Sequence, residues 1–70
     1  MTLQEFFAAL QNTNMVVSVQ EQGSGEATTE LVKLYSLGYE QLLTSLLART
    51  VDKINVKGAG ETVVILAAAV

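Results

Sequence analysis

Apolar residues recur at helical spacing near the start of the chain. Four of them share one face of a helix, at positions i, i+3, i+4 and i+7: Leu3, Phe6, Phe7 and Leu10. Thr2 and Glu5 have the spacing of a capping box, in which each side chain bonds a backbone amide of the first turn. The pattern therefore predicts an amphipathic helix over about residues 2–11.

A second stretch shows the same period more strongly. Its apolar residues fall at i, i+3, i+4, i+7 and i+8: Tyr39, Leu42, Leu43, Leu46 and Leu47. Glu40 stands near the start of this stretch and Arg49 near its end, where the helix dipole favours an acidic and a basic residue. We predict a second helix that begins at Ser36 or Gly38 and ends before Thr50.

Elsewhere the apolar period is that of β-strands. Val17 and Val19 alternate with other residues, GSGE gives a glycine turn, and ATTELVKLYSL is rich in β-branched and aromatic residues, so a hairpin is predicted over about residues 15–36. After the second helix, Ile54 and Val56 alternate with polar residues, GAG turns the chain, and ETVVILAAAV forms a last strand that is apolar on both faces.

The order of these elements is α-β-β-α-β-β. We expect one α+β domain over residues 1–70, built from two helix-plus-hairpin units at about 2–36 and 37–70. The simplest packing is a four-stranded antiparallel sheet with both helices packed on one face.

The last strand needs cover on both faces, and one layer of helices covers only one. In one interpretation this strand is central, and its small alanines tolerate partial exposure. In the other, a second copy of the chain covers its free face or edge, since large apolar patches seldom stay exposed. The candidate residues for such a homodimer or higher oligomer are Val63, Ile65, Ala67 and Ala69.

The composition excludes several kinds of chemistry. The chain has no cysteine and no histidine, so disulfides, thiol nucleophiles and imidazole bases are absent, as are the two commonest zinc ligands. The turns GSGE and GAGE are not followed by Lys-Ser or Lys-Thr, which a phosphate-binding loop requires. We therefore predict no enzymatic activity, no cofactor and no metal.

Charge is unevenly distributed along the chain, which has a net charge of −3. Residues 1–48 hold five glutamates and one lysine, whereas residues 49–70 hold three basic and two acidic residues. The basic residues of this second part, Arg49, Lys53 and Lys57, are few for a nucleic-acid interface, so that class is the least favoured.

Partner-contact candidates come from the acidic first hairpin and from the two tyrosines at the entry to the second helix. They are Glu21, Glu26, Glu30, Tyr35 and Tyr39. The alternatives are a solvated acidic hairpin and tyrosines packed in the core. The longest closing apolar run, VVILAAAV, has 8 residues, whereas a membrane-spanning helix needs about 20. With no signal-peptide pattern at Met1, we expect a cytoplasmic protein without membrane contact.

Over most of its length, and most clearly over residues 35–66, the chain resembles a group of short uncharacterised phage and prophage proteins of Gram-positive gut bacteria. The resemblance is carried by four short motifs: Glu5-Phe6-Phe7, Gly38-Tyr39-Glu40, the run Leu46 to Val51, and the spacing Val51, Ile54, Val56. It implies an accessory protein that acts by binding in the bacterial cytoplasm. The leading hypothesis is an inhibitor of a host defence nuclease, comparable to anti-CRISPR proteins, whose acidic hairpin meets a basic groove. The alternative is a self-assembling or virion-associated protein.

Overall fold

The chain begins with a helix, and two short helical segments connect its two β-hairpins. The computed structural model describes residues 1–11, 14–25, 27–58 and 60–68. Its elements in chain order are α1 (Leu3–Ala9), β1 (Val16–Gln22), β2 (Thr28–Tyr35), the 3-10 helix η1 (Ser36–Gln41), α2 (Thr44–Leu47), β3 (Val51–Val56) and β4 (Glu61–Leu66). The protein is thus α+β, with a four-stranded sheet as expected.

The first helix forms as its capping pattern predicts. The backbone N–H of Thr2 donates to Glu5 Oε1 at 2.9 Å, and the N–H of Glu5 donates to Thr2 Oγ1 at 3.2 Å. These bonds satisfy amides that have no partner within the first turn. The helix buries Leu3, Phe6 and Phe7.

The predicted second helix is broken into two short pieces. Residues 36–41 form a 3-10 helix, Leu42 and Leu43 are extended, and only Thr44–Leu47 is α-helical. Tertiary contacts account for the break: Tyr39 stacks on Phe7, with ring centroids 4.8 Å apart and planes 7° apart. Because the chain is extended at this break, Leu42 and Leu47 both pack against the same core. This tertiary packing outweighs the preference of the sequence for a continuous helix.

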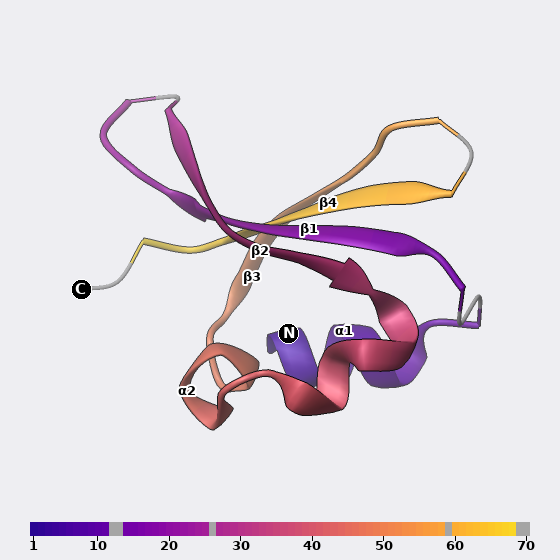
Figure 1. Cartoon of the computed structure of the whole chain (residues 1–70). Coiled ribbons are helices and arrows are strands. Elements are labelled where there is room, and N and C mark those ends of the chain that lie inside the picture. The colour runs from indigo at the N-terminus through magenta and orange to yellow at the C-terminus, as the bar shows by residue number, and fades with distance from the viewer. Residues whose placement is uncertain (12–13, 26, 59, 69–70) are drawn as a thin grey trace.

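The sheet is mixed, which corrects the expected antiparallel arrangement. Its order is β2-β1-β4-β3, and β1 pairs with β4 in parallel, whereas both hairpins are antiparallel. Burial explains this order: β4 is apolar on both faces and takes an interior position beside β1, while the charged β3 lies at the edge. The chain from β2 to β3 passes beneath the sheet through η1 and α2 (Figure 1).

The core lies between the sheet and the helical segments. Its buried cluster contains Leu3, Phe6, Phe7, Val17, Val19, Val64 and Leu66. Figure 1 shows α1 and α2 below the strands, with both hairpin tips directed away from them. We call the sheet side that carries this cluster the inner face, and the opposite side the outer face.

The interior position of β4 explains how a strand with two apolar faces is covered. Side chains alternate along a strand, so Val63 and Ile65 lie on the outer face, yet they are only 3% and 9% exposed. Their neighbours in register are Ser18 and Asn55 beside Val63, and Gln20 and Lys53 beside Ile65. Long polar side chains cover apolar surface with their stems while their polar ends stay in water. A single chain therefore encloses this strand.

That enclosure removes the reason for expecting a second copy on β4. The strand is not an edge, and Val63 and Ile65 present little apolar surface to a partner. Ala67 is half-buried, and its N–H donates to the carbonyl of Thr50 at 2.9 Å. Ala69, the fourth residue predicted for self-association, lies outside the described residues.

Candidate protein-binding surface

Glu21 and Glu30 of the acidic hairpin lie on opposite faces of the sheet. Gln20 is opposite Glu30 in register and Glu21 is opposite Thr29, with a bulge next to Gln20. Because Gln20 and Glu21 are consecutive in a strand, the two glutamates point to different sides. Glu26 lies outside the described residues.

Each of these two glutamates also has a partner within the chain. Glu21 Oε1 lies 3.7 Å from Arg49 Nη2, which itself donates to the carbonyl of Ala67 at 2.7 Å. Glu30 Oε1 accepts a hydrogen bond from Ser18 Oγ at 3.2 Å. The two carboxylates therefore do not form one acidic surface.

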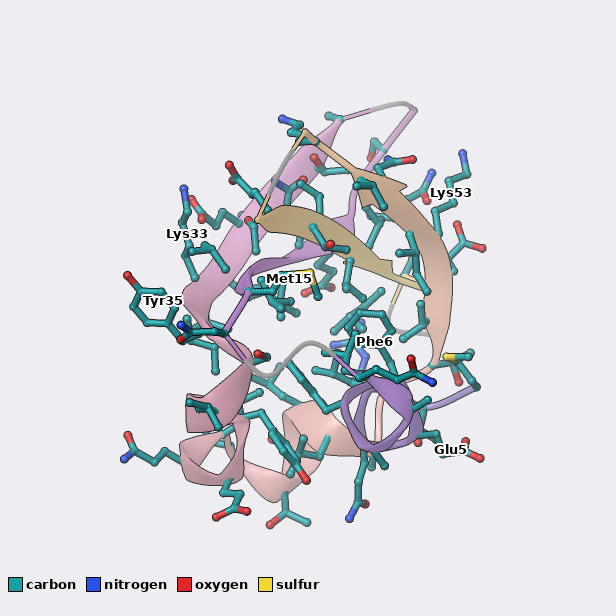
Figure 2. The ribbon with its side chains drawn as sticks, turned by 90° about the vertical axis from the view of Figure 1, so that its right-hand side faces the viewer. Glu5, Phe6, Met15, Lys33, Tyr35 and Lys53 are labelled. Carbon is teal, nitrogen blue, oxygen red and sulfur yellow. The ribbon has the colours of Figure 1, made fainter. Side chains whose placement is uncertain are left out.

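The two tyrosines are separated in the same way. Tyr39 is half-buried and stacks on Phe7, so it packs in the core. Tyr35 ends β2 on the outer face and is 60% exposed. Figure 2 shows its ring and Lys33 leaving β2 on the same side of the molecule, away from the core that holds Phe6.

A shallow depression lies beside the Tyr35 ring. It has a volume of about 270 Å³ and is lined by Val16, Lys33, Leu34 and Tyr35. Val16 is opposite Tyr35 in β2 and next to Glu61 in β4, so it sits between them on the outer face. An aromatic ring, an aliphatic floor and a lysine stem thus surround an open, mainly apolar space.

An ion pair that crosses β1 holds one side of this depression. Lys33 Nζ lies 3.3 Å from Glu61 Oε1, although β1 separates their strands. The residue of β1 opposite Lys33 is Ser18, whose small side chain lets the lysine pass over it. Both charged side chains are partly exposed, at 53% and 36%, so the pair contributes at most about 1 kcal/mol and mainly orients the lysine.

Known proteins were compared with this chain. No protein family, curated protein or solved structure matches it. The phage-type resemblance of the chain therefore stays a prediction, and the Tyr35 depression has to be interpreted from its own residues.

The described residues offer little for metal or cofactor binding. Within residues 1–11, 14–25, 27–58 and 60–68, no group of three or more acidic side chains is placed to hold a metal ion. The depression is also below the roughly 300–1,000 Å³ of typical small-molecule sites. Among the helices that the structure describes, none is long and apolar enough to cross a membrane.

The residues that line the depression all belong to the hairpin that the sequence predicts, but the sequence did not predict that Glu61 lies beside this hairpin. Val16 and Glu61 are 45 positions apart in the chain, and they become neighbours because β1 and β4 pair in parallel. The alternation of Lys33 and Tyr35, two residues apart in a predicted strand, was the available signal that they share a face.

Proposed function

We propose that this protein is a non-enzymatic binding module that recognises a protein partner through the Tyr35 depression. The observation that carries the proposal is the position of Tyr35, which is 60% exposed beside an apolar hollow on the face of a sheet. Exposed tyrosines are enriched at protein interfaces and often dominate their binding energy.

The depression suits one apolar side chain of the partner. Val16 and the Tyr35 ring provide apolar contact, and the Tyr35 hydroxyl and Lys33 ammonium supply hydrogen bonds at the rim. A tyrosine ring on a paired strand has few rotamers to lose on binding, so its contact area comes at a low entropic cost. A protein side chain is therefore a better occupant than a free cofactor.

As the biological role we propose a phage-type accessory protein that inhibits a host defence nuclease in the bacterial cytoplasm. The small size and the lack of histidine and cysteine favour action by contact rather than by catalysis. The contact surface differs from the acidic hairpin first expected, because Glu21 and Glu30 face opposite sides. A self-assembling or virion protein is the alternative role.

Photo-crosslinking from two positions tests the contact surface. A benzophenone side chain replaces Tyr35 in one variant and Leu43 in the other, since Leu43 is similarly exposed at 69% but lies between η1 and α2. We expect a specific adduct with one protein from position 35 and none from position 43. Equal labelling from both positions, or labelling from 43 alone, would contradict the proposal.

The affinity for the crosslinked protein then measures how much Tyr35 contributes to binding. Tyr35→Ala should weaken binding about thirtyfold, as for a hot-spot tyrosine worth about 2 kcal/mol, and Leu43→Ala should leave the affinity unchanged. Tyr35→Phe separates the ring from the hydroxyl. An affinity that Tyr35→Ala does not change would refute the site.

A further inference from the structure

The edge of β3 is a further surface, and the described residues cover only its first part. β3 is the outermost strand on its side of the sheet, and an edge strand presents backbone N–H and C=O groups that another chain can pair with. Figure 2 shows Lys53 leaving this strand on the side of the molecule opposite to Lys33 and Tyr35. The edge is therefore distinct from the Tyr35 depression.

The first residues of this edge already pair with extended backbone. Thr2 and Thr50 form an antiparallel bridge, the N–H of Leu3 donates to the carbonyl of Arg49 at 2.9 Å, and the N–H of Val51 donates to that of Met1 at 2.8 Å. Met1–Thr2 thus acts as a short strand beside the start of β3. From Asp52 onward, no residue of the described chain continues this pairing.

The open part of β3 alternates apolar and polar side chains, and two of the polar ones are basic. Ile54 and Val56 are in register with Val64 and Thr62, so they share the inner face, yet they are 42% and 74% exposed. Lys53 is in register with Ile65 on the outer face, and Lys57 continues the same alternation. One side of the edge is therefore apolar, and the other carries two lysines with Asn55 between them.

We propose that the β3 edge binds an extended acidic segment of a partner protein as a fifth strand. Apolar residues of that segment would cover Ile54 and Val56, and its alternate carboxylates would meet Lys53 and Lys57. Main-chain pairing supplies affinity in this mode of recognition, and the alternate side chains supply specificity. An antiparallel segment continues the pairing that Met1–Thr2 begins.

A second copy of the chain suits this edge poorly. Two copies could pair their β3 edges in a symmetric antiparallel arrangement that keeps like faces together. In one register, Ile54 lies opposite Val56 of the other copy and Lys53 lies opposite Lys57. In another, the two Ile54 residues lie opposite each other and the two Lys53 residues are diagonal neighbours. Both arrangements gather four lysines on one face. Like charges on neighbouring strands are destabilising, so an acidic partner is favoured over a homodimer.

Two capped peptides test the proposal on the whole chain. In one, valine alternates with glutamate over seven residues, and in the other valine alternates with lysine. The protein carries no N-terminal tag, because residues added before Met1 would extend along β3. Backbone amide shifts and amide exchange are followed by NMR at low and high salt.

We expect the glutamate peptide to shift and protect amides of residues 52–57, and to bind about tenfold more tightly than the lysine peptide. Added salt should weaken it, since the lysines are exposed. The double variant Lys53→Glu, Lys57→Glu should reverse the preference between peptides. Gln41→Glu, which adds a negative charge at an exposed position at the end of η1, should keep it.

Several results would overturn the proposal. The glutamate peptide could fail to bind at millimolar concentration, both peptides could bind equally well, or the amide shifts could be confined to β2. Changes in β3 amides with protein concentration alone would assign the edge to a second copy instead. The wild-type peptide comparison stands even if the double variant fails to fold. Apart from shifts confined to β2, these results leave the Tyr35 site unaffected, because its test uses other residues.

Discussion

Replacing Ile65 tests whether one chain encloses its own central strand. Ile65 lies on the outer face of β4, where no helix covers it, yet it is only 9% exposed. Its neighbours in register are Gln20 and Lys53, two long polar side chains. The substitution Ile65→Ala removes apolar contacts with these stems and with the sheet beneath them.

The structure sets the expected size of the effect. Truncating a buried isoleucine to alanine costs about 2–5 kcal/mol, and the cost is lower where the surroundings can collapse into the space. Exposed polar side chains can collapse, so we expect a loss of about 2 kcal/mol in the free energy of unfolding. A core of this size supplies only about 3–5 kcal/mol, so the variant should keep about 1–3 kcal/mol of stability.

Urea unfolding at two protein concentrations that differ a hundredfold measures this loss. The matched control is Val56→Ala, because Val56 is 74% exposed and a surface truncation of this kind changes stability by less than about 0.5 kcal/mol. We expect the same loss for Ile65→Ala at both concentrations, because the cover comes from the same chain. The milder Ile65→Val should cost about 0.5–1.5 kcal/mol and keeps the comparison possible if the alanine variant does not fold.

Two results would refute this reasoning. If Ile65→Ala cost no more than Val56→Ala, the polar side chains would not be covering Ile65. If the wild-type midpoint rose with protein concentration, mass action would show that a second copy stabilises the fold. The second result would restore the homodimer first expected from the sequence of β4.

Three further predictions concern the capping box and one turn. Thr2→Ala should lower the free energy of unfolding by about 1 kcal/mol, measured by urea titration, because the Glu5 amide loses its acceptor. The hydrogen bonds from the Thr2 backbone and side chain lower the pKa of Glu5, so its contribution is present above the unfolded pKa of about 4.3 and disappears as pH falls through the folded value. Urea midpoints from pH 7 to pH 3 should therefore fall less for Glu5→Gln than for the wild type, and an identical fall would count against the capping contribution. Gly60 has φ of 84°, so Gly60→Ala should destabilise by about 1–2 kcal/mol, as followed by thermal unfolding, whereas an unchanged melting temperature would show that the turn can rearrange.

Local patterns in the sequence predicted the elements that depend on local contacts. The capping box of Thr2 and Glu5 and both hairpins depend on residues close in the chain, and all are present. The second helix was wrong as a continuous element because Tyr39 is held by Phe7, which lies 32 positions away. The parallel pairing was missed because the alternation within a strand fixes its faces but not its neighbour.

In the candidate site, too, the sequence predicted what depends on local contacts and missed what depends on distant ones. The residues that line the hollow beside Tyr35 all belong to the predicted hairpin, but the ion pair of Lys33 with Glu61 depended on the parallel pairing of β1 with β4. The acidic hairpin was misjudged because nearness in sequence was taken as nearness in space. Glu21 and Glu30 are close along the hairpin, and the pleat sends them to opposite sides.

The parallel contact between β1 and β4 also determines when the protein can fold during synthesis. β4 is made after every other strand, yet it takes a place between β1 and β3. Until it leaves the ribosome, the hairpin of β1 and β2 has no neighbour on its open side, and pairing over such a long separation in sequence is slow. Val17 and Val19, which the folded sheet buries, therefore lack their β4 neighbours until the last strand has been made.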